Sequence, residues 1–232
     1  MNPNFPVFFE HQLLSSPLAV SEALMQYGIV YIDFKNIDIG SIQDEALCIN
    51  YKTENRVIRA DCGQVKGMLP IASKYLFNRG FLPVFGKCLG PFTRVFEESF
   101  IQRSSGEFSA PSSRLHFDRR RTLKVWFYPF DVHEIGGGGM RVVAGSGAEN
   151  GKIRRRDVNF LNMNDLSNSI NFPQAGIVEE LEAKSQIVYG EAGTVFLHDT
   201  DVWHGATELG KNQVRYIYRS HTRANKLLYS FI

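Results

Sequence analysis

The segment RLHFDR at positions 114–119 holds two side chains that can share a metal ion, His116 and Asp118. On a β-strand, residues i and i+2 project from the same face, so an imidazole nitrogen and a carboxylate oxygen can meet at one point. Binding of a divalent metal is the usual reason to bring these two groups together. Two ligands leave most of the coordination sphere empty, so a third must come from elsewhere. Without a third ligand, an ordinary surface pair on a strand is the better explanation of the two residues.

The best candidate for the third ligand is His204, in the segment DVWHGA at positions 201–206. Two histidines and one carboxylate on one face of an octahedron form the facial triad of non-haem Fe(II) oxygenases. A rival set, His198, Asp199 and Asp201, lies close by. His198 and Asp199 are adjacent, so a strand points them to opposite faces and they cannot both chelate without a bulge. We interpret Asp199 and Asp201 as turn residues between strands.

Arg215 follows His204 by eleven residues. A buried arginine near such an iron suits a dicarboxylate co-substrate, because its planar guanidinium holds a carboxylate through two parallel hydrogen bonds. Arg219 shares the face of Arg215 if the strand is regular, and is therefore an alternative. Arg103, on a neighbouring strand, is a further candidate for the co-substrate site. The competing interpretation of Arg215 is a solvated side chain on a strand.

This ordered set resembles the Fe(II)/2-oxoglutarate-dependent dioxygenases, specifically their phytanoyl-CoA dioxygenase-like branch. The segment LKVWFY at 123–128 is similar to the strand after the first metal motif of that branch. The segment GMRVVAGSG at 139–147 is similar to its "RVVPGSH" turn, with Ala144 for Pro and Gly147 for His. The segment AGTVFLH at 192–198 is similar to the strand before the second metal histidine. The resemblance runs from about position 100 to position 223.

The resemblance implies a mainly β protein with flanking helices, built as a double-stranded β-helix (a jelly roll, cupin-like). It implies that His116, Asp118 and His204 hold Fe(II), that Arg215 pairs with the far carboxylate of 2-oxoglutarate, and that Trp126 lies beside this co-substrate. The implied reaction consumes O2, gives succinate and CO2, and hydroxylates or otherwise oxidises an unactivated C–H bond of a small molecule. Related halogenases carry Gly or Ala at the position of the carboxylate, so Asp118 favours hydroxylation or another oxidation over halogenation.

One domain is expected over residues 1–232, because jelly rolls of this size are common as single domains. We predict a helical N-terminal part over 1–91, a jelly-roll core over 92–223 and, inserted between two core strands, a lid over 147–184. The predicted N-terminal elements are an irregular arm over 1–15, a helix from Pro17 that Gly28 ends, a strand over 29–34, and helices over 41–52 and 69–78, with Gly80 and Pro83 beyond the last.

The core strands are predicted from runs of β-branched and aromatic residues between Gly-rich or polar turns. A Ser-, Gly- and Pro-rich loop is expected at 104–113, just before the metal strand, and four glycines at 136–139 predict a mobile turn. A further helix is expected around Asp165. The predicted strands cover 92–103, 122–131, 140–144, 186–189, 194–197, 203–207 and 213–221.

The sequence contains two runs of arginine, Arg119–Arg121 after the metal motif and Arg154–Arg156 on the predicted lid, and two interpretations are open. The simplest is a solvated charged surface. The alternative is that Arg119 or Arg121 faces the pocket and holds an acidic substrate, a carboxylate or phosphate. Neither run has the interleaved aromatic residues of a platform for single-stranded nucleic acid.

Composition excludes several classes of function. Hydrophobic residues make up 44% of the chain, charged residues 22%, and the net charge is only +2, which does not indicate a nucleic-acid partner. Nucleic-acid demethylases of the wider superfamily also carry a different arginine spacing. No apolar run approaches the roughly 20 residues that cross a bilayer, and the first residues lack the pattern of a signal peptide. Three scattered cysteines, Cys48, Cys62 and Cys88, predict free thiols in the cytoplasm.

Two other functions compete with the oxygenase. A non-redox, metal-binding cupin-like protein, such as an isomerase or a ligand-binding module, would bind another metal and would not depend on 2-oxoglutarate. An inactive scaffold that keeps only the fold is the third hypothesis, and the intact set of His116, Asp118, His204 and Arg215 argues against it.

Overall fold

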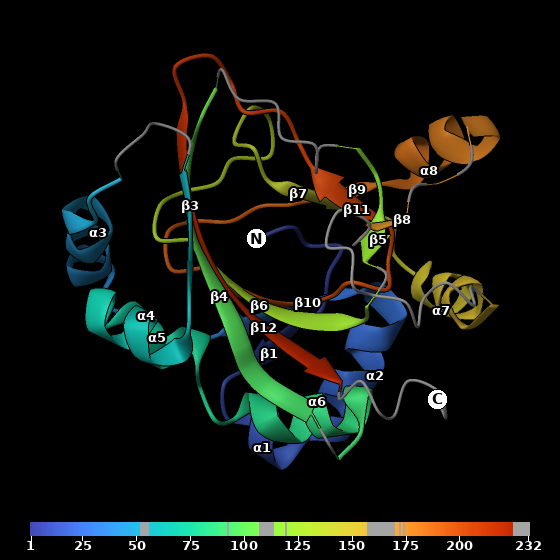
Figure 1. The fold of residues 1–232 in the computed structure, drawn as a ribbon, viewed down its shortest axis with the longest axis horizontal. Coiled ribbons are helices and arrows are strands. Elements are labelled where there is room, and N and C mark those ends of the chain that lie inside the picture. The colour runs from blue at the N-terminus through green and yellow to red at the C-terminus, as the bar shows by residue number, and fades with distance from the viewer. Residues whose placement is uncertain are drawn as a thin grey trace.

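Two β-sheets form the centre of the computed structural model, which describes residues 1–51, 56–91, 93–106, 114–118, 120–156, 170–171, 173 and 175–224. The large sheet has seven strands in the order β1-β2-β10-β6-β12-β4-β3, and the small one has the order β11-β7-β9 (Figure 1). A third pairing joins β5 to β8. The strands are β1 (Val7–Phe9), β2 (Ile29–Asp33), β3 (Arg56–Ala60), β4 (Thr93–Ser105), β5 (Phe117–Asp118), β6 (Thr122–Phe127), β7 (Met140–Val142), β8 (Ile170–Asn171), β9 (Gln186–Val188), β10 (Val195–Asp199), β11 (His204–Ala206) and β12 (Val214–Ala224).

Helices cover one face of the large sheet, with α2, α5 and α6 in contact with its strands (Figure 1). The helices are α1 (Gln12–Ser15), α2 (Pro17–Tyr27), α3 (Ile39–Cys48), α4 (Cys62–Met68), α5 (Ala72–Leu76), α6 (Phe81–Leu89), α7 (Gly147–Arg156) and α8 (Val178–Lys184), with a 3-10 turn at Ala175–Ile177. Within the described part of the chain, no helix combines the length and apolar character needed to cross a bilayer.

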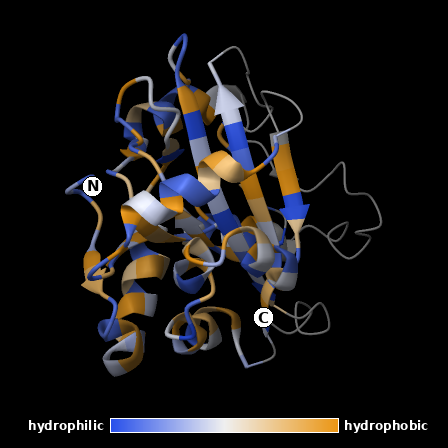
Figure 2. Ribbon diagram, turned by 90° about the vertical axis from the view of Figure 1, so that its left-hand side faces the viewer, coloured by the Kyte–Doolittle hydropathy of each residue, from blue (hydrophilic) through white to orange (hydrophobic). Residues whose placement is uncertain are grey.

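Strand β6 runs through the middle of the large sheet, and all six of its residues are buried. Its alternate side chains Leu123, Val125 and Phe127 join the apolar core beneath the helices. Trp126 belongs to a second apolar cluster on the opposite face, and Lys124 shares that face because strand side chains alternate. The visible strands in Figure 2 accordingly carry both hydrophobic and hydrophilic segments. The face opposite the helices is therefore the one that can hold polar chemistry.

The predicted core strands are confirmed in order and approximate position, from β4 through β6, β7, β9, β10, β11 and β12. The helix predicted from Pro17 also ends as expected, since Gly28 adopts the left-handed conformation that glycine favours, with φ of 77°. Most of the predicted loop over 104–113 and the helix expected around Asp165 lie outside the described residues. The described parts of 147–184 include α7 and α8, and their role as a lid stays a prediction.

The prediction for the first 91 residues needs correction in three places. Residues 1–15, expected to be an irregular arm, contain the short strand β1, which pairs in parallel with β2, and helix α1. Residues 56–60 form β3 at the edge of the large sheet. Gly80 and Pro83 do lie beyond the predicted helix, seen as α5, but a second helix that the sequence did not predict, α6, begins there. Gly80 precedes α6 and Pro83 occupies its first turn. Proline is tolerated there because first-turn N–H groups have no intrahelical acceptor.

Gly28 also fixes the approach of α2 to the segment that leads into β11. A Cβ atom built on Gly28 would lie 2.4 Å from Cγ1 of Val202, two residues before His204. We expect Gly28→Ala to lower the free energy of unfolding by about 1–3 kcal/mol, because positive φ and the clash with Val202 both oppose a side chain. Chemical denaturation of the two proteins measures this difference. An exposed glycine with open space around it, Gly67, gives the matched control, and equal stability of Gly28→Ala and wild type would contradict the expectation.

Candidate metal centre

His116 and His204 are brought together by an antiparallel bridge between the segment that leads into β5 and the first residue of β11. Their backbones exchange two hydrogen bonds, His116 N to His204 O and His204 N to His116 O, each 2.8 Å long. Directly paired residues project from the same face, so their two rings lie with centroids 4.4 Å apart. Asp118 follows on the face of His116, as the i, i+2 spacing predicted.

Apolar side chains between the ligands hold this arrangement from behind. Leu115, Phe117, Val143 and Trp203 form a separate buried cluster, in which Phe117 and Trp203 meet edge to face at 4.8 Å. Each of these residues except Val143 is adjacent in sequence to a proposed ligand. Because alternate strand residues point to opposite faces, packing of this cluster forces the His and Asp side chains to the cavity side.

The three ligand groups converge. One nitrogen from each histidine and one oxygen of Asp118 lie within 4.8 Å of one another, the one group of at least three His, Cys, Asp or Glu residues in the described chain that meets this criterion for a metal site. Nδ1 of His116 lies 2.8 Å from the Arg114 carbonyl, and Nδ1 of His204 lies 2.9 Å from the Val202 carbonyl. A protonated Nδ1 that donates to a carbonyl leaves the lone pair of Nε2 for a metal.

Burial and charge set the protonation states that metal binding needs. Burial lowers the pKa of His116, and lowers the pKa of His204 well below its usual value, so both rings are neutral near pH 7. Burial acts to raise the pKa of Asp118, but the Lys124 ammonium and neighbouring groups outweigh it and lower that pKa to about 2. Nε2 of His204 is buried and has no hydrogen-bond partner among the residues that the structure describes. This donor set, two neutral imidazoles and one carboxylate, fits a divalent transition metal.

Lys124 contacts this donor set, although it was not among the site residues predicted from the sequence. Its Nζ lies 2.9 Å from Oδ2 of Asp118, while Oδ1 of Asp118 lies 3.7 Å from Nε2 of His204. The two carboxylate oxygens therefore have different partners, one held by the ammonium and one directed toward the imidazole. The only signal in the sequence was a lysine at an inward position of an otherwise apolar strand.

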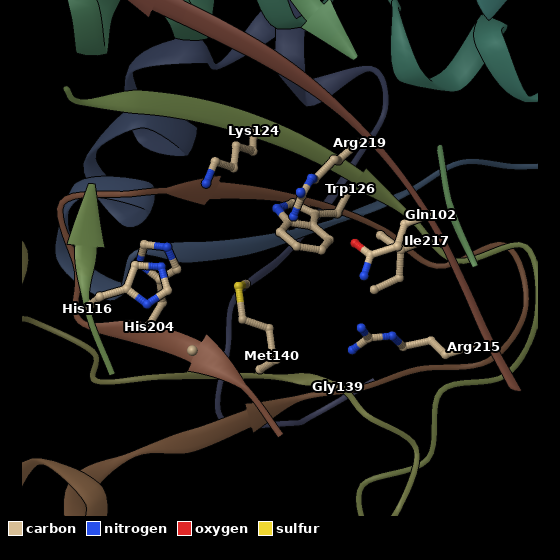
Figure 3. Close-up of a pocket in the computed structure, with 12 residues that line it drawn as sticks. Gln102, His116, Lys124, Trp126, Gly139, Met140, His204, Arg215, Ile217 and Arg219 are labelled. Carbon is tan, nitrogen blue, oxygen red and sulfur yellow. The ribbon is translucent and has the colours of Figure 1, made fainter. Parts of the chain in front are cut away.

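A cavity opens beside His116 and His204, and Arg215 and Trp126 both line it, as Figure 3 shows. Nη1 of Arg215 donates a hydrogen bond to the Gly138 carbonyl, and its buried Nε has no partner in the described part of the chain. The cavity is lined by Gln102, His116, Lys124, Trp126, Gly139, Met140, His204, Gly205, Ala206, Arg215, Ile217 and Arg219. The two predicted histidine ligands, His116 and His204, lie at one end of this space, and Arg215 extends into it from the other (Figure 3).

Arg219 lines the same cavity, and its side chain is placed by two aromatic rings. The guanidinium carbon lies 4.7 Å from the ring centroid of Phe100 and 5.2 Å from that of Trp126. Burial lowers the pKa of Arg219 to about 10, so the side chain remains charged near neutral pH. Both arginines on β12 that the sequence offered as candidates therefore face the cavity.

The structure places Arg103 on the other face of the large sheet, which corrects its proposed place in the co-substrate site. Its Nε donates to the hydroxyl of Tyr216, whose ring packs against the core beneath the helices. Gln102, one residue earlier, takes the position toward the cavity. A strand turns successive side chains to opposite faces, so a prediction that is wrong by one residue exchanges cavity and core.

Arg121 is engaged with carboxylates behind the site and is not a lining residue of the cavity. Its Nη2 lies 2.6 Å from Oδ2 of Asp199, its Nη1 donates to the Cys88 carbonyl, and Asp201 lies 3.4 Å from Nε. Asp199, interpreted as a turn residue, is in fact the last residue of β10. Arg119 and the side chains of Arg154–Arg156 lie outside what the structure describes.

His198, the rival ligand, lies near the triad but outside it. Its ring centroid is 4.4 Å from that of His204, it is fully buried, and within the described ranges neither of its nitrogens has a hydrogen-bond partner. Asp199 beside it pairs with Arg121, which agrees with the expectation that the two adjacent residues cannot chelate together.

No family model matches the chain, and no curated protein matches it in sequence. Solved structures do match in fold. The epimerase SnoN, in complex with Fe3+, α-ketoglutarate and nogalamycin RO, has a TM-score of 0.62 at 13% identity over 90% of this chain and 84% of that one. EctD from S. alaskensis with bound Fe has a TM-score of 0.59 at 14% identity over 89% and 76%. HygX from Streptomyces hygroscopicus, with nickel and 2-oxoglutarate bound, has a TM-score of 0.57 at 12% identity over 90% and 86%.

These matches confirm the predicted jelly-roll fold with flanking helices. The matched proteins themselves were solved with Fe3+ and α-ketoglutarate, with Fe, or with nickel and 2-oxoglutarate. Identity below 25% supports the fold alone, so the phytanoyl-CoA dioxygenase-like branch stays a prediction.

Proposed function

We propose that this protein is a non-haem Fe(II)- and 2-oxoglutarate-dependent dioxygenase that oxidises a C–H bond of a small molecule. The observation that carries the proposal is the convergence of His116, Asp118 and His204 within 4.8 Å at one cavity that also receives Arg215. Similarity of fold alone would not carry it, because one fold hosts many functions.

His116, Asp118 and His204 would hold the iron, each through one atom. Iron with 2-oxoglutarate and O2 supplies oxidation of an unactivated C–H bond, with succinate and CO2 as the products of the co-substrate. The buried, neutral imidazoles can ligate without first losing a proton. Lys124 keeps Asp118 ionised and holds Oδ2, which leaves Oδ1 directed toward the metal position.

Arg215 would bind the distal carboxylate of 2-oxoglutarate. Its planar fork can add two parallel hydrogen bonds to that carboxylate. Trp126, Met140 and Ile217 supply apolar walls that exclude water from the space between the arginine and the ligands. The contact of Arg215 with the Gly138 carbonyl orients the guanidinium before the co-substrate arrives.

Hydroxylation is the reaction we propose. The structures of similar fold include an epimerase, SnoN, and a carbocyclase, SnoK, as well as EctD in complex with 2-oxoglutarate and 5-hydroxyectoine. These descriptions show that one scaffold supports several outcomes of oxidation. A complete His, Asp, His set favours hydroxylation over halogenation in this chain, since the carboxylate occupies the position that halide would need.

The proposal is tested by turnover of the co-substrate. Apo protein is supplied with Fe(II), ascorbate, 2-oxoglutarate and air, with and without a library of small acidic and neutral metabolites, and succinate is quantified. We expect succinate to form with Fe(II) but not with Zn(II), and to increase when a substrate is present. Tight Zn(II) binding with neither 2-oxoglutarate binding nor succinate formation would support the non-redox cupin-like protein instead.

A further inference from the structure

Three cationic side chains line the cavity on the strands of the large sheet: Lys124, Arg215 and Arg219. Lys124 is paired with Asp118, and Arg215 donates to the Gly138 carbonyl and is assigned to 2-oxoglutarate above. Arg219 is different. Within the part of the chain that the structure describes, it makes no ion pair and no hydrogen bond, and its buried Nε has no partner.

The two rings beside Arg219 orient it for a ligand. Phe100 on β4 and Trp126 on β6 are its direct neighbours in the strand pairing, and its guanidinium lies close to both rings. Stacking of this kind satisfies the faces of a guanidinium and leaves the N–H groups on its edge free to donate. Figure 3 shows the side chain directed into the space between Lys124 and Arg215.

Arg219 occupies its own place along the cavity. It lies four residues from Arg215 on the same face of β12, and His221, the next residue on that face, is paired with Lys124. Four strand residues span roughly 13 Å along β12, so the two guanidinium groups start from well-separated points of the backbone. An oxyanion at Arg219 would therefore lie nearer the metal end than one bound by Arg215.

The charge balance of the cavity favours binding of an anion at Arg219. A guanidinium whose Nε is buried and that has no counterion among the described residues is destabilised by the loss of water. A bound oxyanion offsets that loss through charge-assisted hydrogen bonds. Asp118 is the single carboxylate of the candidate metal site, and its oxygens face Lys124 and His204. A divalent metal at the triad would add two positive charges, which the two carboxylates of one 2-oxoglutarate would offset. The surplus of the three cations Lys124, Arg215 and Arg219 over the single carboxylate of Asp118 would therefore remain.

We propose that Arg219 anchors an oxyanion of the organic substrate, a carboxylate or a phosphate, so that the enzyme acts on an acid. This inference rests on the proposed function, because it assumes that Arg215 holds the co-substrate. Arg219 replaces Arg121 as the candidate acid-binding residue, since Arg121 is already paired with Asp199. Arg119, the other earlier candidate, lies outside the described residues.

The test uses the complex with Mn(II) in place of Fe(II) and saturating 2-oxoglutarate, with butyrate as the probe. The paramagnetic metal speeds relaxation of nearby protons, so the methyl protons of butyrate report binding close to the triad. Butyramide, of the same shape but uncharged, is the control probe. We expect relaxation by the complex to be about tenfold stronger for butyrate, the factor that one charge-assisted contact of about 1.4 kcal/mol provides.

Variants then assign the effect. Arg219→Met should reduce the relaxation of butyrate to that of butyramide, Arg219→Lys should retain part of the difference, and Arg79→Met, at an exposed turn, should retain all of it. Inorganic phosphate, followed by phosphorus relaxation, forms a second arm. An effect on phosphate alone that depends on Arg219 identifies a phosphate-bearing substrate and also supports the proposal.

The outcomes separate the two proposals. If wild-type protein with Mn(II) does not bind 2-oxoglutarate in a calorimetric titration, the proposed function fails. If 2-oxoglutarate binds but neither anion shows relaxation that depends on Arg219, only the present inference fails. If Arg219→Met, folded by circular dichroism, loses binding of 2-oxoglutarate, Arg219 is a co-substrate ligand and the inference is overturned.

Discussion

Replacing His204 with Ala is expected to abolish high-affinity metal binding and, with it, formation of succinate. We expect affinity for Mn(II) or Fe(II) to fall by at least about 100-fold, because two protein ligands remain where three converge, and loss even of a supporting outer contact typically costs 10–100-fold. Turnover of 2-oxoglutarate should fall below about one thousandth of wild type, since the reaction has no other site for its chemistry.

Calorimetric titration of the apo protein with Mn(II) measures the first effect without relying on activity. The matched control is His198→Ala. His198 is also a buried histidine, its ring lies 4.4 Å from that of His204, and it is the strand partner of the cavity-lining Lys124 in the large sheet. Both variants remove an imidazole from nearly the same place, so a general loss of packing should affect them alike. Only His204→Ala should lose the metal.

The opposite result would exchange the two histidines. If His198→Ala lost Mn(II) binding while His204→Ala kept it, the proposed ligand set would be wrong. The bridge between β11 and the segment that leads into β5 would then not build the metal site. Equal, partial losses of Mn(II) affinity in both variants would show that His198 shares the metal with the three proposed ligands. Either result would remove the observation on which the proposed oxygenase depends.

The candidate site was predictable from sequence because its parts obey strand geometry. The i, i+2 spacing of His116 and Asp118 needs only a strand, and β5 is one, although the structure assigns it just two residues. The spacing of eleven residues from His204 to Arg215 requires only that the two segments that carry them, β11 and β12, follow one another along the chain. What the sequence did not show is the bridge between His116 and His204, since pairing between residues 88 positions apart leaves no local pattern.

Residues whose partners are distant in sequence were predicted least well. Lys124 looked like a single polar interruption in an apolar strand, and its role follows from Asp118, which reaches it from another strand. Arg121 looked like part of a solvated run, yet its partner Asp199 lies on β10. Charge alone cannot say which arginine of a run turns inward, because a change of one residue reverses its face.

Short elements were missed for a different reason. Strand β1 and helix α1 contain three and four residues, too few to show a period of 2 or 3.6. Helix α6 was missed because Gly80 and Pro83 both signal a break, whereas here they mark its beginning. These errors lie in the N-terminal part and leave the cavity unaffected, since that part mainly packs against the opposite face of the large sheet.

Replacing Arg215 with Met is expected to weaken binding of 2-oxoglutarate by about 100-fold, corresponding to the 2–5 kcal/mol lost when one partner of a buried charge pair is removed. Methionine keeps much of the length and apolar stem of arginine but donates no hydrogen bond. Arg215→Lys should recover only part of the loss, because an ammonium keeps the charge without the planar fork. Titration of each Mn(II) complex with 2-oxoglutarate measures the change.

A second ligand makes the assignment specific to one carboxylate. 2-Oxopentanoate has the keto acid end and chain length of 2-oxoglutarate but lacks its distal carboxylate. If Arg215 pairs with that carboxylate, the substitution should strongly weaken binding of 2-oxoglutarate but change the affinity for 2-oxopentanoate by no more than about threefold. The interaction energy between Arg215 and the carboxylate is then seen only when both are present. Equal weakening of both ligands would mean that Arg215 acts through the shape of the cavity. If binding of neither ligand weakened, the distal carboxylate would be assigned to Arg219 instead, because Arg219 is the other guanidinium among the described residues that line this cavity.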